Sequence, residues 1–110
     1  MRIRLFLAAL IATLPVAAEA QGVIVANTSS CGTYLQDRQE GSPYQIQLDA
    51  GEVRAYISGF NMATSGKPTQ SIPEADSVLA YMDKYCRDHP LDNTILGMGA
   101  LIKDLGGTRK

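Results

Sequence analysis

The sequence predicts a small all-α domain, a compact bundle of about four helices closed by one disulfide. Apolar residues recur at helical spacing in four stretches, and no alternating strand pattern with hairpin signals accompanies them. Two cysteines follow a leader typical of exported proteins, where disulfides form. We expect one domain over residues 21–110, after removal of residues 1–20.

The leader MRIRLFLAALIATLPVAAEA has the three parts of a secretory signal peptide. Arg2 and Arg4 form a positive start, an apolar stretch follows, and AEA at 18–20 offers small residues for cleavage. The apolar stretch is shorter than the roughly 20 residues that span a membrane. We therefore expect cleavage before Gln21, a periplasmic location in a bacterium, and no membrane attachment after cleavage.

Composition excludes several classes of function. The expected mature chain has eight Lys and Arg against ten Asp and Glu, a net charge of −2. This balance lacks the basic footprint of a nucleic-acid-binding domain and the cationic face of a lipid-binding helix. Trp is absent and Phe60 is the only Phe beyond the leader, so aliphatic residues and Tyr must build a marginal core.

Cys31 and Cys86 are expected to form an intramolecular disulfide in the oxidising periplasm. The bond would close a loop of 56 residues, for which chain entropy gives about 4 kcal/mol of stabilisation. A metal pair, a catalytic thiol and an intermolecular bridge are the alternatives. A metal pair has only one His and no CxxC spacing to support it, and a catalytic thiol leaves the second Cys unexplained.

The first helix is expected to follow Ser30, a residue type favoured at helix N-caps. Cys31 would then lie in its first turn. Gly41 and Pro43 are expected to end the helix, because both residue types interrupt helical backbone.

The second helix is expected to have Asp49 as its N-cap, with Glu52 at the spacing of a capping box. Gly66 and Pro68 would stop it. Gly59 lies beside the apolar stripe and is expected to admit another helix at close range. The stripe consists of Leu48, Val53, Tyr56, Ile57 and Phe60.

The third helix is the most strongly patterned. Ser71 and Glu74 form a capping box with Pro73 in the first turn, and Pro90 ends the helix. Cys86 lies on the apolar face, so the disulfide would tie this helix to the first. That face consists of Ala75, Val78, Leu79, Met82, Tyr85 and Cys86.

The fourth helix is expected to start at Asp92 as its N-cap and to end at the glycine pair 106–107. Gly97 and Gly99 lower its intrinsic helix propensity. Its apolar seam consists of Leu91, Ile95, Met98, Ile102 and Leu105.

No nucleophile–base pair, phosphate loop or calcium-loop spacing is recognisable, so we expect no enzyme activity, no cofactor and no metal. His89 is the only imidazole. It could sense pH or act as a general base, but a surface His near a helix C-terminus is the favoured interpretation, because positive charge is favourable there without any further role. The tyrosines in the expected helices of the mature chain are expected to lie in the core. They are Tyr34, Tyr56, Tyr81 and Tyr85.

The order of these features, with the segments YISGFN and YCRDHP, resembles the HdeA/HdeB family of periplasmic acid-stress proteins over residues 30–105. The resemblance implies an all-α fold with one disulfide and chaperone activity that needs no ATP. It also implies a protein that is folded at neutral pH, with a homodimer as a candidate state, and that partly unfolds in acid to bind unfolded periplasmic proteins.

Acid would take the mature chain from a charge of −2 to about +9, and repulsion would open its weakest helices first. Two other functions stay open: an immunity protein of the Tai-like class that blocks a secreted cell-wall-degrading toxin, and a periplasmic binding protein without chaperone activity. The apolar residues expected to meet a client after opening are Val53, Ile57, Phe60, Ile95, Met98 and Ile102.

Overall fold

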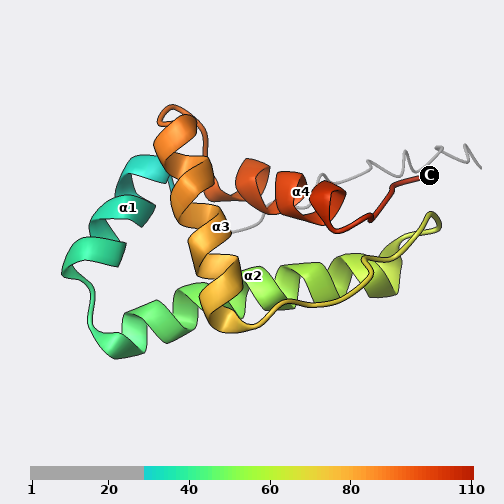
Figure 1. Ribbon diagram of the computed structural model, residues 1–110, viewed down its shortest axis with the longest axis horizontal. Helices are drawn as coiled ribbons and strands as arrows, with labels where there is room; N and C mark the ends of the chain where they lie inside the picture. The colour runs from blue at the N-terminus through green and yellow to red at the C-terminus, as the bar shows by residue number, and fades with distance from the viewer. Residues whose placement is uncertain (1–28) are drawn as a thin grey trace, which may run out of the picture.

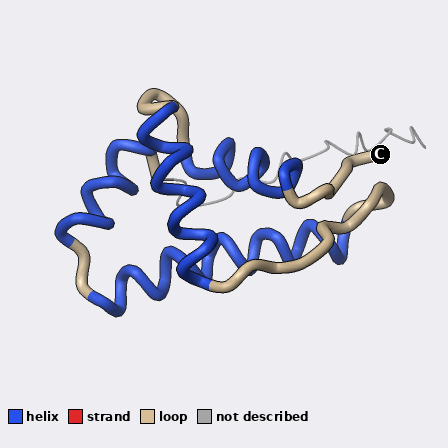
Figure 2. Tube along the Cα trace, viewed as in Figure 1, coloured by secondary structure: helices blue, strands red, loops and turns tan. Residues whose placement is uncertain are grey.

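The computed structural model describes residues 29–110, so the expected signal peptide and its cleavage site at Gln21 lie outside the described residues. The described range contains four helices and no strand, which confirms the all-α prediction. Figure 1 shows α1 (Cys31–Glu40), α2 (Pro43–Ala63), α3 (Ala75–Asp88) and α4 (Thr94–Asp104). The long loop of residues 64–74 joins α2 to α3 (Figure 2).

The third helix is the centre of the bundle. Figure 1 shows α3 running steeply down across α2, with α4 extending away from it toward the C-terminus; α3 packs against α1, α2 and α4. Helix α2 also contacts α1 and α4. The core between the four helices is formed by Cys31, Tyr34, Ala50, Val53, Ile57, Val78, Leu79, Met82, Cys86, Met98, Leu101 and Ile102.

The predicted disulfide is present. Cys31, the first residue of α1, is bonded to Cys86 near the end of α3, and both side chains are fully buried. The bond joins residues 55 positions apart and closes a loop that contains α2. Helix α4 follows that loop in the chain. In the part of the chain that the structure describes, no disulfide joins α4 to the loop, and α4 is held against it by non-covalent contacts.

The start of α1 is confirmed, whereas the start of α2 was predicted wrongly. Ser30 caps α1 by accepting a hydrogen bond from the amide of Thr33. Helix α2 begins at Pro43, six residues before the predicted cap at Asp49, because Ser42 caps it in the same manner. Serine followed by proline is a signal for a helix start, so Pro43 begins α2 and is not only the residue that ends the preceding helix.

The starts of α3 and α4 also differ from the prediction. Helix α3 begins after Glu74, which makes no side-chain cap hydrogen bond, and Ser71 instead accepts a hydrogen bond at its carbonyl from Thr69. Helix α4 has Asn93 as its N-cap in place of Asp92. Its predicted end is confirmed, since α4 stops just before the glycine pair 106–107.

Glycine marks a close helix contact at Gly97, where the sequence had predicted one at Gly59. Gly59 is exposed, and a Cβ added there would meet no atom within 4 Å. A Cβ at Gly97 would lie 2.7 Å from Cε of Met82 and 2.9 Å from Cδ1 of Tyr85. Helices α3 and α4 therefore approach closely at Gly97, where α4 has no side chain.

Candidate functional site

The six predicted client-binding residues gather where α2 meets α4, a region that we call the α2–α4 seam. Four of them are buried: Val53, Ile57, Met98 and Ile102. Phe60 and Ile95 are half-buried at its edge. The structure therefore brings the six residues together but encloses most of them in the folded domain; it does not test whether they bind a client.

The seam opens at one end into a groove of about 750 Å³, which we call the α2–α4 groove. Its floor is apolar, and its volume falls within the range of small-ligand sites. The groove is lined by Tyr56, Gly59, Phe60, Ala63, Thr64, Ser65, Ile95, Arg109 and Lys110.

The C-terminal segment reaches this groove because it is held against the loop that follows α2. The amide of Thr108 donates to the carbonyl of Lys67 over 2.9 Å, and the hydroxyl of Thr64 donates to the carbonyl of Thr108 over 2.7 Å. These two contacts place Arg109 and Lys110 at one end of the groove.

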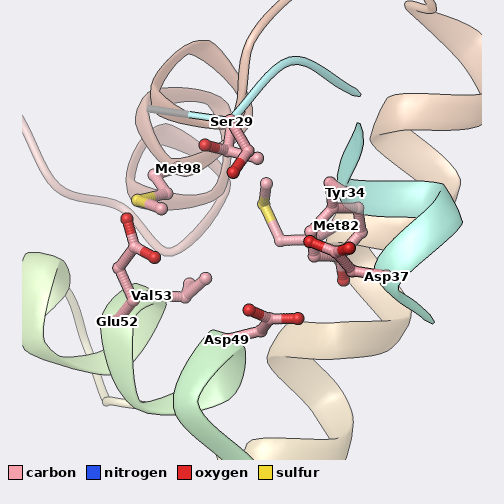
Figure 3. A pocket seen from close by; sticks show the side chains of 9 residues that line it. Ser29, Tyr34, Asp37, Asp49, Glu52, Val53, Met82 and Met98 are labelled. Atoms are coloured by element: carbon pink, nitrogen blue, oxygen red, sulfur yellow. The ribbon is translucent and has the colours of Figure 1, made fainter. Parts of the chain in front are cut away.

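The other end of the seam is an acidic crevice of about 10 Å³, shown in Figure 3. Asp37 of α1 and both Asp49 and Glu52 of α2 line it. One carboxylate oxygen of Asp49 accepts a hydrogen bond from Gln45, and the other is buried without a hydrogen-bond partner. Although Glu52 is exposed overall, partial burial of its carboxyl and the nearby charge of Asp49 raise the pKa of Glu52.

Two tyrosines of α3 hold the two ends of α4. The hydroxyl of Tyr81 donates to Asp104, the last residue of α4, over 2.6 Å. The hydroxyl of Tyr85 donates to Asp92, just before α4, over 2.5 Å. The hydrogen bond to Asp92 and partial burial raise the pKa of Tyr85 to about 12. Burial and the bond to Asp104 raise the pKa of Tyr81 as well.

A third carboxylate joins α1 to α3. Asp83 accepts hydrogen bonds from the guanidinium of Arg38 and from the hydroxyl of Tyr34. Burial alone would raise the pKa of Asp83, but the bonds from Arg38 and Tyr34 outweigh it and hold that pKa below its usual value. The ionised carboxylate therefore stabilises the folded state at neutral pH.

His89 follows the last residue of α3 and is exposed. Its ring stacks on that of Tyr85 with 4.3 Å between centroids, and its Nδ1 lies 3.0 Å from the carbonyl oxygen of Tyr85.

In the part of the chain that the structure describes, no group of three or more His, Cys, Asp or Glu is arranged to hold a metal ion. Nor does any helix there have the length and apolarity to cross a bilayer.

Sequence reasoning missed the tyrosine–carboxylate contacts. It assigned the tyrosines to the core, and only Tyr34 is buried there. Two of the three pairs are far apart in sequence: 23 positions separate Tyr81 from Asp104, and 49 separate Tyr34 from Asp83. Helix packing brings these two pairs together. Tyr85 and Asp92 are seven positions apart and meet across the turn after α3, a contact that no helical periodicity predicts.

Comparisons with models of known protein families, with curated proteins and with solved structures find no match for this chain. The resemblance to the HdeA/HdeB family therefore stays a prediction. What the protein does must follow from the seam, the groove and the carboxylate contacts.

Proposed function

We propose that the protein is a periplasmic acid-stress chaperone that works without ATP. It is closed at neutral pH, opens in part in acid, and binds unfolded proteins through the α2–α4 seam. One observation carries the proposal: α4 covers the apolar seam, and the side-chain hydrogen bonds that fasten α4 to α3 have carboxylates as acceptors.

These contacts are hydrogen bonds to carboxylates: Tyr85 donates to Asp92 and Tyr81 donates to Asp104. A hydrogen bond to an ionised carboxylate is shorter and stronger than one between neutral groups. We propose that acid opens the domain by weakening contacts of this kind. Protonation also leaves the described part of the chain with a charge of about +9, and the resulting repulsion favours the open state.

Helix α4 is the element most suited to move. Gly97 and Gly99 each lower its helix propensity by about 1 kcal/mol relative to Ala. Because α4 lies outside the disulfide-closed loop, it can swing away while Cys31–Cys86 keeps α1 and α3 together. The backbone hydrogen bonds that join residues 92 and 94 to residues 31 and 29 would serve as the hinge.

Opening would uncover side chains suited to a client. Ile57 of α2 is fully buried when the domain is closed, and Met98 and Ile102 of α4 are at most 5% exposed. Unfolded proteins offer apolar segments of no fixed sequence, and aliphatic and Met side chains adapt to such segments. The proposed function needs no site for ATP and no catalytic group.

The proposal is tested with oxidised protein taken from pH 7 to pH 2. We expect the fluorescence of an apolar dye to rise below about pH 4, where carboxylates protonate, and light scattering of an acid-denatured client enzyme to fall in parallel. A Tyr81→Phe/Tyr85→Phe variant should open at a higher pH. Tyr56→Phe is the matched control, because the hydroxyl of Tyr56 makes no hydrogen bond with residues 29–110.

Unchanged dye fluorescence and undiminished client aggregation down to pH 2 would overturn the proposal. Tight binding of a secreted toxin by the closed protein at pH 7, without any response to acid, would instead favour the immunity function. If Tyr56→Phe moved the opening pH as far as the double variant, the hydrogen bonds to Asp92 and Asp104 would not be the acid-sensitive contacts.

A further inference from the structure

We propose that the α2–α4 groove of the closed domain binds a long-chain aliphatic carboxylate, such as a fatty acid. The chain would lie between α2 and α4, and the carboxylate would lie beside Arg109 and Lys110. This site shares Phe60 and Ile95 with the edge of the seam, but it belongs to the folded protein at neutral pH and does not require the acid-opened state proposed above.

The size and the lining of the groove suit an aliphatic chain. Its volume of about 750 Å³ is that of a small-ligand site. Tyr56, Phe60 and Ile95 are half-buried along it, and Ala63 is exposed at its wall. A methylene chain laid there would remove its own apolar surface and theirs from water, which favours binding.

The polar groups of the groove argue against an extended peptide as its occupant. Of the three hydroxyls that line the groove, that of Thr64 is already engaged, since it donates to the carbonyl of Thr108 and accepts from the amide of Gly66, and only those of Tyr56 and Ser65 remain. A peptide brings one amide and one carbonyl with each residue, and each needs a partner when it is buried. Residues 29–110 contain no strand whose edge could supply such partners. An aliphatic chain requires none.

The charges favour an anionic head group. Arg109 and Lys110 lie at one end of the groove, and an adjoining hollow of about 240 Å³ shares Arg109 and adds Lys103. No Asp or Glu lines either hollow, although the described chain has more acidic than basic residues. The carboxylates of Asp49 and Glu52 instead lie at the opposite end of the seam. A carboxylate is therefore attracted to the end that the cations occupy.

The first test uses dodecanoate at pH 7, below its micelle concentration, with calorimetry and NMR titration of the mature chain. We expect saturable binding of one ligand, with resonance shifts at Phe60 and Ile95. Dodecyltrimethylammonium has the same chain with a cationic head and should bind at least about tenfold more weakly. Changing both cations, Arg109→Gln/Lys110→Gln, should weaken dodecanoate binding by about tenfold.

The second test fills the groove without weakening the fold. Gly59 lines the groove, and a Cβ added there meets no atom within 4 Å outside the backbone of its own helix. Gly59→Leu removes a helix-weakening glycine, so lost binding would not come from unfolding. Gly51→Leu is the matched control, because Gly51 is equally open in α2 but lies outside the groove. We expect Gly59→Leu to lose dodecanoate binding by more than about tenfold and Gly51→Leu to keep it.

Three results would overturn this assignment: no saturable binding of dodecanoate, equal affinity for the cationic amphiphile, or unchanged binding by Gly59→Leu. Each is measured at pH 7 on the closed domain. A failure here therefore leaves the acid-dependent dye and scattering experiments to decide the chaperone function independently.

Discussion

Arg38 of α1 and Asp83 of α3 form a bidentate ion pair, in which Nε lies 2.9 Å from Oδ1 and Nη2 lies 3.1 Å from Oδ2. The Cys31–Cys86 disulfide joins the same two helices. The contact between α1 and α3 thus has one component that acid weakens and one that acid leaves intact. In the proposed acid-opened state, α1 would therefore stay attached to α3 through the disulfide.

Replacing Asp83 by Asn should lower the free energy of unfolding at pH 7 by about 1–2 kcal/mol, because hydrogen bonds to a charged acceptor are lost. The pKa of Asp83 is lower in the folded state than in the unfolded state. Its stabilisation is therefore fully present above about pH 4 and is lost as the pH falls through the folded pKa. Urea unfolding of oxidised protein should show the difference at pH 7 and little of it at pH 2.

Asp88→Asn is the control for this prediction. Asp88 pairs with Lys84 on the same helix, but the two side chains are 52% and 75% exposed. Solvent screens such a pair, so its loss should change stability little. Equal changes in the free energy of unfolding for the two substitutions would contradict the prediction, because the Arg38–Asp83 pair would then stabilise the fold no more than an exposed pair does.

Glu52 should respond to acid in the opposite sense. Its pKa is raised in the folded state, so the ionised carboxylate destabilises the fold at neutral pH and protonation relieves this as the pH falls. Glu52→Gln should therefore increase the free energy of unfolding at pH 7 by about 0.5 kcal/mol, a value reduced for solvent screening. The gain should vanish in urea unfolding at pH 3.

Glu74→Gln serves for comparison, because Glu74 is exposed and makes no side-chain cap hydrogen bond. It should not reproduce the gain at pH 7. A loss of stability in Glu52→Gln at pH 7 would mean that the charge of Glu52 is favourable in the crevice. The ionised carboxylates of Glu52 and Asp83 would then both stabilise the folded state at pH 7.

Local signals were sufficient for the helices and the disulfide but not for every helix start. The cap at Ser30 and most of each apolar stripe depend on residues a few positions apart, and these predictions were confirmed. Leu48 and Leu91 were assigned to the stripes wrongly, because their side chains are 47% and 99% exposed. Asp92 and Asn93 are adjacent residues of equal capping type, and Asn93 is the cap. Asp92 accepts the hydroxyl of Tyr85 instead, a contact that depends on how α3 packs beside the following loop.

The candidate site was predictable only in its apolar part. Phe60 and Ile95 lie on helical stripes, and these stripes correctly bring them to the α2–α4 seam. The cationic end of the groove was not predicted, because Arg109 and Lys110 reach it through the hydrogen bonds of Thr108 with the loop after α2. Contacts between loops produce no periodic pattern of apolar residues, so the sequence does not predict them.

Removing the disulfide should cost the domain about 4 kcal/mol of stability, the chain-entropy value for a loop of this length. The variant Cys31→Ala/Cys86→Ala should unfold at much lower urea concentration than oxidised protein at pH 7. Reduced wild-type protein should behave like the variant, which separates loss of the bond from loss of the buried sulfur atoms. A midpoint equal to that of oxidised protein would contradict the prediction.

Gly97→Ala should destabilise the protein although alanine is the better helix former. The added Cβ would meet Met82 at 2.7 Å and the ring of Tyr85 at 2.9 Å. The end of Met82 can shift, but the hydrogen bond to Asp92 restrains the ring of Tyr85. Overpacking of this kind costs about 1–3 kcal/mol, which exceeds the gain of about 1 kcal/mol in helix propensity.

Gly99→Ala separates the two effects within the same helix. A Cβ at Gly99 meets no atom within 4 Å, so only the gain in helix propensity remains and the variant should be more stable than wild type. Urea unfolding at pH 7 should therefore shift in opposite directions for Gly97→Ala and Gly99→Ala. Stabilisation by both would mean that α3 and α4 move apart at little cost. Helix propensity, and not the close contact at Gly97, would then set the stability of α4.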